Sequence, residues 1–295
     1  MTVSSDYTDF PDIHRYARLE GLSPEVLATA YRLEEKYHRL LLEEDDPEKR
    51  VGLYDELYAK LIPLYNRKTA QNPADNPKNK YVKLFAPELR DKSVVDFGCG
   101  DGQMLLAIDR LLKTRSLSGI DVVVSKDLKA HESIHFVEGN LMTHEFDEPF
   151  DVAFSDNVLE HLVLQDAQTH LNNIYRNLNP GGKLIIIMPN RLFGPWDITR
   201  IKDFSQSGKT EAMGGHVNES THYEMIECLQ KAGFKEFRTI LPIPKLKYML
   251  FNKLRTGTTW MKKLEKSPRP MRLIKALRYK GVSLLRFPVT LIATK

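Results

Sequence analysis

The sequence predicts an α/β fold with a Rossmann-like, seven-stranded and mostly parallel sheet that is covered by helices on both faces. Three observations lead to this prediction. An apolar strand at 93–97 runs into a glycine-rich turn and an amphipathic helix, and strand and helix patterns alternate from there to about residue 240. The helix at 164–178 ends cleanly at the Asn-Pro-Gly-Gly of 179–182. Such alternation is typical of right-handed βαβ crossovers and a parallel sheet.

Two helices that form a hairpin are expected before the sheet. Ser-Pro-Glu at 23–25 and Asp-Pro-Glu at 46–48 are helix-start signals, and each is followed by leucines and tyrosines at helical spacing. These tyrosines either line a substrate pocket or pack in an amphipathic core with hydrated hydroxyls. Residues 1–20 are polar, lack the apolar core of a signal peptide and are expected to be loosely ordered. The polar stretch 69–80 contains two Asn-Pro steps and is expected to be a loop.

The remaining elements follow from hydrophobic periodicity. The strands are expected at 93–97, 117–121, 134–138, 150–155, 183–188, 235–243 and 287–294. The helices among them are expected at 102–114, 124–130, 164–178 and 221–232. The chain should therefore divide into three parts: an N-terminal helical extension with its linker, a core, and two helical inserts that cap the active site. Their bounds are 1–80 for the extension, 81–243 and 284–295 for the core, and 191–219 and 244–283 for the inserts.

Composition narrows the class of protein. Hydrophobic residues make up 42% of the 295 residues and charged residues 28%, which is ordinary for a soluble globular protein. Two cysteines, Cys99 and Cys228, exclude a disulfide framework and offer no metal-knuckle spacing, so a cytoplasmic location is expected. No stretch approaches 18 apolar residues, so no membrane span is expected.

Polar residues follow the successive strands at the edge where a doubly wound sheet binds its ligand. Asp96 and the glycines at 98, 100 and 102 follow the first strand. A dinucleotide fingerprint would require glycine at 103, where Gln103 stands. Asp121 follows the second strand, where a carboxylate can bind both ribose hydroxyls. Asn140 follows the third with an amide suited to an adenine edge, and Asp156 and Asn157 follow the fourth.

Three motifs carry a family resemblance: D-x-G-x-G-x-G at 96–102, NVLEHL at 157–162 and LNPGGKLIIIMPN at 178–190. In this order and spacing they resemble class I S-adenosylmethionine-dependent methyltransferases of the ubiquinone-biosynthesis type, over residues 93 to about 240. The resemblance implies S-adenosylmethionine as cofactor. The cofactor-binding residues that it implies are Asp96, Gly98, Cys99, Gly100, Asp121, Val122, Asn140, Leu141, Asp156 and Asn157. Asn140 departs from the family by replacing a commoner aspartate.

The chemistry expected is in-line methyl transfer, most readily to an oxygen atom. Because the sulfonium is already activated, the protein must position the acceptor and exclude water, and a hydroxyl acceptor also needs a base. The candidates for catalysis are His216, His161 and Asp156, with Glu160 as a further possible base. In ubiquinone-type O-methyltransferases, which the chain resembles, and in small-RNA 3′-terminal 2′-O-methyltransferases, an E-x-x-E-H run with a later histidine can hold a divalent metal. Here Asn157 occupies the position of the first carboxylate residue in that run. No metal ligand is therefore assigned, and a metal-assisted reaction is the alternative.

The acceptor is expected to be a small-molecule, glycan or lipid-linked hydroxyl. The insert at 244–283 carries twelve cations and one acid, Glu265, interleaved with large apolar residues. This pattern suits an anionic acceptor or contact with a membrane surface, or else it is a solvated basic face on a helical cap. Nucleic acid is the least favoured partner, since no binding module for it is present. A non-catalytic cofactor-binding scaffold is the rival from another class, and the sequence does not predict an oligomeric state.

Overall fold

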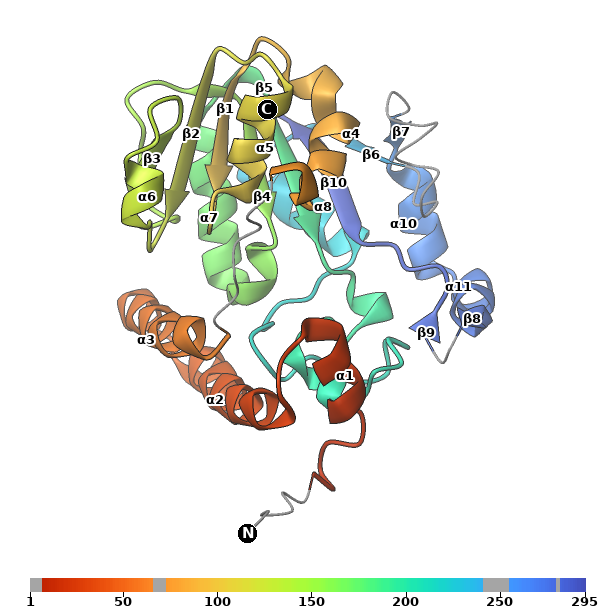
Figure 1. The fold of residues 1–295 in the computed structure, drawn as a ribbon. Coiled ribbons are helices and arrows are strands. Elements are labelled where there is room, and N and C mark those ends of the chain that lie inside the picture. Colours follow the sequence, from red (N-terminus) through yellow and green to blue (C-terminus); the bar gives the residue numbers. More distant parts are fainter. Residues whose placement is uncertain (1–6, 66–72, 241–254, 280–281) are drawn as a thin grey trace. The chain divides into compact units, whose positions relative to one another are not determined.

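The computed structural model describes residues 7–65, 73–240, 255–279 and 282–295 (Figure 1). The chain forms two compact units, which are described separately. The sheet unit comprises Lys68–Met188, Ser220–Ser267 and Phe287–Lys295. The helical unit comprises Met1–Arg67, Pro189–Glu219 and Pro268–Arg286. Within the described residues, no helix is long and apolar enough to cross a membrane.

The sheet unit is built on an eight-stranded sheet, counted over the described residues, in the order β3-β2-β1-β4-β5-β10-β6-β7 (Figure 1). The strand bounds are β1 Ser93–Phe97, β2 Ser116–Asp121, β3 His135–Glu138, β4 Phe150–Asp156, β5 Leu178–Met188, β6 Glu236–Thr239, β7 Thr256–Gly257 and β10 Val289–Thr294. The five neighbouring strands β3, β2, β1, β4 and β5 run parallel to one another, and β10 is antiparallel to both β5 and β6. The predicted fold class is confirmed. The eighth strand, β7, has two residues, too few for a periodic pattern.

Helices cover both faces of this sheet (Figure 1). Their bounds are α4 Asn79–Leu89, α5 Gln103–Leu111, α6 Lys126–Lys129, α7 Leu164–Arg176, α8 His222–Ala232 and α10 Thr259–Lys266. Helices α5, α6, α7 and α8 confirm the predicted ones, with shorter bounds. Helix α4 was not predicted, although Val82, Phe85 and Leu89 are fully buried at helical spacing and pack in the same hydrophobic cluster as α5.

The topology creates the edge at which a ligand can bind. Strand β1 lies between β2 and β4: the chain runs outward from β1 to β2 and β3 on one side, and then crosses back to β4 and β5 on the other. Parallel register brings the carboxyl ends of β1, β2 and β4 to the same edge, as in the pairing of Phe97 with Ile120 and of Asp96 with Phe154. This topological switch point is where open α/β sheets bind ligands.

The helical unit contains the predicted hairpin. Its elements are α1 Ile13–Glu20, α2 Pro24–Glu43, α3 Pro47–Tyr65, the short 3-10 turns η3 Arg191–Phe193 and η4 Ile198–Ile201, α11 Pro268–Ala276, β8 Arg278–Tyr279 and β9 Val282–Ser283. The expectation that residues 1–20 are loosely ordered is wrong for 13–20, which form α1. Ile13 is fully buried and Tyr16 nearly so, and they pack with residues of α2 and η4, because tertiary burial stabilises this short helix.

The tyrosines of the hairpin behave as core residues. Tyr31 and Tyr37 are 2% and 1% exposed. Their hydroxyls donate hydrogen bonds to Glu35 and Glu56, at 3.0 and 2.7 Å. This is the arrangement expected for a buried ring with a polar tip, and it favours the core interpretation of these two tyrosines.

Candidate functional site

The glycine turn after β1 leaves room for a ligand at one defined position. The backbone N–H groups of Gly98 and Cys99 both donate to Ile120 O, at 2.8 and 3.1 Å, which ties the turn to β2. Gly98 and Gly100 have φ of 84° and 54°. A Cβ on Gly98 would lie 2.3 Å from Val158 Cγ2, whereas a Cβ on Gly100 would meet nothing within 4 Å. The backbone at Gly100 therefore faces open space, as close approach of a ligand requires.

Asp96, at the end of β1, presents a carboxylate atom that lacks a partner. The residue is 2% exposed, and among the described residues no hydrogen-bond donor reaches its Oδ1. Burial raises the pKa of Asp96 well above its usual range, and the nearby Asp156 adds to this while the Lys78 ammonium opposes it. A buried acceptor without a donor is costly. A ligand amine or hydroxyl placed here would satisfy it, so the residue fits the polar part of the expected cofactor.

Asp121, at the end of β2, contacts the glycine turn directly. Its Oδ2 accepts a hydrogen bond from the Gly100 N–H at 2.7 Å. Burial raises the pKa of Asp121, while the N–H groups of Gly100, Val123 and Val122 stabilise the carboxylate and lower it. The structure thus brings Asp121 and Gly100 together, as the strand-end prediction requires, and places Val122 beside the carboxylate.

The loop after β3, which carries Asn140 and Leu141, is held on helix α7. Asn140 Oδ1 accepts from the Met142 N–H at 2.8 Å, so Nδ2 is the side-chain atom that could donate to a ligand. Leu141 O accepts from Asn173 Nδ2 at 3.0 Å and lies 3.3 Å from His170 Nδ1. Sequence reasoning identified the loop but not the two α7 side chains that hold it.

His170 also joins this loop to strand β4. Burial lowers the pKa of His170 to about 4, so the ring is neutral at pH 7. Because the Leu141 carbonyl can only accept, Nδ1 carries the proton, and Ser155 Oγ donates to Nε2 at 3.1 Å. The neutral ring therefore couples the ends of β3 and β4 through one buried side chain.

Lys78 lies at the carboxyl edge of the sheet, a position that the sequence did not reveal. Its Nζ lies 2.5 Å from Asp156 Oδ2, and the side chains are 23% and 4% exposed. Burial raises the pKa of Asp156, and the Lys78 ammonium opposes that rise. Asn76 Nδ2 donates to Gln103 O at 2.8 Å, which places the segment before α4 beside the start of α5. The region predicted as a plain loop thus contributes contacts at the carboxyl edge of the sheet.

The other strand-end residues are placed as follows. Asn157 is exposed, takes the left-handed conformation with φ of 57°, and donates Nδ2 to Asp156 Oδ1 at 3.1 Å. Cys99 is 6% exposed and its thiol packs in the core against Gly119, so a contact with the cofactor would come from its backbone. Glu160 is buried and His161 half-buried in the 3-10 turn after β4. Their catalytic roles stay predictions.

His216 belongs to the helical unit and is paired with a buried carboxylate. Its Nδ1 lies 2.8 Å from Glu219 Oε1, and the two side chains are 11% and 4% exposed. The same Glu219 oxygen accepts from the Trp196 N–H at 2.9 Å. Sequence reasoning chose His216 but missed Glu219, because the three-residue spacing is informative only in a helix, and this segment is irregular.

Three buried side chains of the helical unit fix the backbone before His216. Asp197 Oδ2 accepts from the Gly214 N–H at 2.8 Å, and Glu34 Oε2 accepts from the Gly215 N–H at 2.6 Å. His38 Nδ1 donates to Gly214 O at 3.0 Å. Burial raises the pKa of Glu34 to about 7, an effect that the nearby Asp197 reinforces and the hydrogen bonds from Tyr65 and Gly215 oppose. The loop is therefore held by three buried side chains, two of which come from the distant helix α2.

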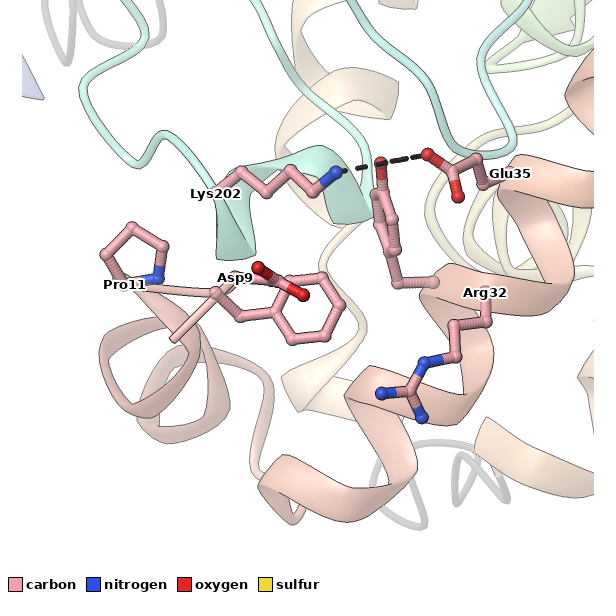
Figure 2. A pocket seen from close by; sticks show the side chains of 7 residues that line it. Asp9, Pro11, Arg32, Glu35 and Lys202 are labelled. Atoms are coloured by element: carbon pink, nitrogen blue, oxygen red, sulfur yellow. Dashed lines mark hydrogen bonds and ion pairs between the residues drawn. The ribbon is translucent and has the colours of Figure 1, made fainter. Parts of the chain in front are cut away.

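A separate hollow of about 500 Å³ lies on the helical unit (Figure 2). It is lined by Asp9, Phe10, Pro11, Tyr31, Arg32, Glu35 and Lys202. Lys202 Nζ lies 4.5 Å from the centre of the Tyr31 ring and 3.9 Å from Glu35 Oε1, which also accepts from the Tyr31 hydroxyl. Among the charged residues that line the hollow, Lys202 and Glu35 are paired, and none of the predicted site residues lines it.

Known proteins resemble this chain in sequence and fold. The family model described as a methyltransferase domain matches residues 61–236. The carboxy-S-adenosyl-L-methionine synthase of Campylobacter lari is 24% identical over 212 residues, which cover 64% of this chain and 86% of the relative. The synthase of the same name from Campylobacter jejuni is 28% identical over 209 residues, with 64% and 85% covered.

Solved structures share this fold. One of them is the 1,6-didemethyltoxoflavin-N1-methyltransferase of Burkholderia thailandensis, solved with bound 1,6-didemethyltoxoflavin and S-adenosylhomocysteine. The TM-score is 0.52 at 15% sequence identity, and the alignment covers 85% of this chain and 91% of the other. Similarity at this level concerns the arrangement of strands and helices.

Proposed function

Because this chain belongs to the methyltransferase-domain family, we propose that it transfers the methyl group of S-adenosylmethionine to the oxygen of an acceptor hydroxyl. The protein is a transferase and S-adenosylmethionine is its cofactor. When bound, this cofactor supplies an electrophilic methyl group on a sulfonium. The acceptor that we propose is a small molecule, a glycan or a lipid-linked hydroxyl. We place the reaction in the cytoplasm, because Cys99 and Cys228 are both free thiols.

The carboxyl edge of the sheet unit would hold the cofactor. Asp121 would accept hydrogen bonds from the ribose hydroxyls, and Asn140 Nδ2 would donate to a ring nitrogen of the adenine. The Asp96 oxygen that lacks a partner among the described residues would accept from the amino group of the methionine part. Two observations support these assignments: the open space at Gly100, and the contact between Gly100 and Asp121.

One observation carries the assignment to oxygen: the pairing of His216 with the buried carboxylate of Glu219. A hydroxyl becomes a good nucleophile only as its proton leaves, so a base has to receive that proton. With Nδ1 donating to Glu219, Nε2 of His216 is the nitrogen that accepts the proton. The carboxylate then stabilises the imidazolium and keeps the ring in one orientation.

The test compares His216→Gln and Glu219→Gln with His14→Gln, an exposed histidine of the same unit. Methyl transfer is followed with labelled cofactor over a panel of phenols, sugars and lipid-linked alcohols. We expect His216→Gln to lower kcat by about a hundredfold or more while cofactor affinity stays unchanged. Glu219→Gln should lower kcat less and move the acid limb of the pH–rate profile to lower pH. Unchanged turnover in His216→Gln would remove this base from the reaction.

Two other reactions are distinguished in the same assay. A metal-assisted transfer would be abolished by a chelator and restored by a divalent ion. The relatives named as carboxy-S-adenosyl-L-methionine synthases suggest that the cofactor itself could be the molecule modified. Mass spectrometry of the cofactor after incubation with small carboxylic acids as carboxyl donors, and without a hydroxyl acceptor, would reveal a carboxylated product in that case and intact cofactor under our proposal.

A further inference from the structure

The segment Pro268–Arg286 of the helical unit concentrates positive charge. It contains no aspartate or glutamate and six cations: Arg269, Arg272, Lys275, Arg278, Lys280 and Arg286. The formal charge of the whole chain is +4, so this short segment alone exceeds the net charge of the protein. Acids elsewhere balance the cations of the chain, but none does so within this stretch of sequence. Such a block has long-range attraction for an anionic surface.

Large apolar side chains are exposed within the same segment. Leu273, Leu277 and Leu284 are 68%, 45% and 56% exposed, and they are three of the eight large hydrophobic side chains that stand exposed in the described residues. Leu273 and Leu277 are four residues apart at the end of α11, where the Leu277 N–H donates to Leu273 O. The Leu284 N–H donates to Leu277 O at 2.8 Å. These backbone hydrogen bonds bring the three leucines near one another, and we call this set of exposed side chains the leucine patch.

Burial along α11 shows that the leucine patch is not the inner face of the helix. Met271 is 5% exposed and fixes the face that packs into the unit. Arg269 and Arg272 are exposed, as are Leu273 and Leu277. A helix that anchors through one apolar face ordinarily turns polar side chains outward. Here leucines and arginines share the outward face, which is the composition of helices that lie in a membrane interface.

We propose that the leucine patch and the exposed Arg269 and Arg272 beside it form a peripheral docking surface for anionic membranes. The leucines would enter the boundary between headgroups and acyl chains, and the guanidinium groups would pair with lipid phosphates and carboxylates. Exposed leucines add nothing to binding a nucleic-acid backbone, so the combination favours a lipid surface. Membrane docking through this surface requires neither a particular acceptor nor the base proposed above.

The test is flotation of the full-length protein with vesicles of two compositions. One is pure phosphatidylcholine, and in the other about a third of the lipid is phosphatidylserine. We expect the wild type to float with the anionic vesicles and to dissociate at high salt. The variant Leu273→Ser/Leu277→Ser/Leu284→Ser should lose about tenfold or more of this binding. Because the changed side chains are exposed, its melting temperature and cofactor affinity should match those of the wild type.

Two controls keep the outcome decisive. Leu42→Ser/Leu164→Ser changes leucines that are 56% and 55% exposed elsewhere on the chain, and should float like the wild type. Arg269→Gln/Arg272→Gln should weaken binding to the anionic vesicles and reduce its salt dependence. Absence of wild-type binding to anionic vesicles, or binding that survives both sets of patch substitutions, would overturn the proposal. Displacement from vesicles by RNA at low concentration would likewise assign the surface to another partner.

Discussion

Adding a methyl group at Gly100 separates ligand binding from folding. In Gly100→Ala the new Cβ meets no protein atom within 4 Å, and the residue keeps a φ of 54°. The backbone strain is about 1–2 kcal/mol for an alanine in the left-handed region. A domain with about 5–15 kcal/mol of stability stays folded at that cost. A cofactor lying against the turn would collide with the methyl group. Overpacking of this kind costs about 1–3 kcal/mol, or roughly 5- to 150-fold in affinity.

Gly181→Ala is the matched control. Gly181 has a φ of 75°, and its Cβ would also meet nothing within 4 Å, but it lies within β5, far in sequence from the glycine turn. Both variants should melt a few degrees below the wild type. Isothermal titration with S-adenosylhomocysteine should show weakened binding for Gly100→Ala alone. Wild-type affinity in Gly100→Ala, or equal loss in both variants, would refute the assignment of the open space to the cofactor.

Two further predictions concern buried charges. Burial raises the pKa of Glu34 from 4.5 to about 7. Between these two pH values the carboxyl group is ionised in the unfolded chain but still protonated in the folded one. The free energy of unfolding therefore falls by about 3 kcal/mol as the pH rises from 4.5 to about 7. Glu34→Gln should flatten this dependence in urea titrations at successive pH values, and an unaltered slope would contradict it. Lys78→Met should cost up to about 3 kcal/mol by leaving the Asp156 carboxylate buried and unpaired. Lys78→Met/Asp156→Asn should regain most of that loss in thermal melts, and additive losses would exclude the coupling.

The sheet could be predicted from the sequence because its signals are local. The strands that the sequence predicts are four to eleven residues long in the structure, and polar residues stand at or shortly after the carboxyl ends of the parallel ones. Parallel pairing then brings Asp96, Asp121 and Asp156 to one edge without any further information. The glycines at 98 and 100 further indicated that a ligand can approach the backbone closely at this edge. For this part of the chain, local pattern and topology are sufficient.

The groups that support the candidate residues within each unit were missed because their partners are distant in sequence. Lys78 and Asp156 are 78 residues apart, and Glu34 and Gly215 are 181 apart. A lysine in a polar loop or a glutamate on a helix has many possible roles, and only the tertiary fold selects one. Helix α1 was missed for a related reason, because Ile13 and Tyr16 acquire their helical stability from packing and not from propensity.

The central claim is that the carboxyl edge of the sheet unit binds S-adenosylmethionine through the carboxylates that end β1 and β2. Calorimetric titration of S-adenosylhomocysteine into the wild type and into Asp121→Ala tests it most directly. The wild type should bind with one site per chain, and the variant should lose detectable binding while remaining folded by circular dichroism. Binding of equal affinity in Asp121→Ala would contradict the account, since the Gly100–Asp121 contact would then lie outside the cofactor site.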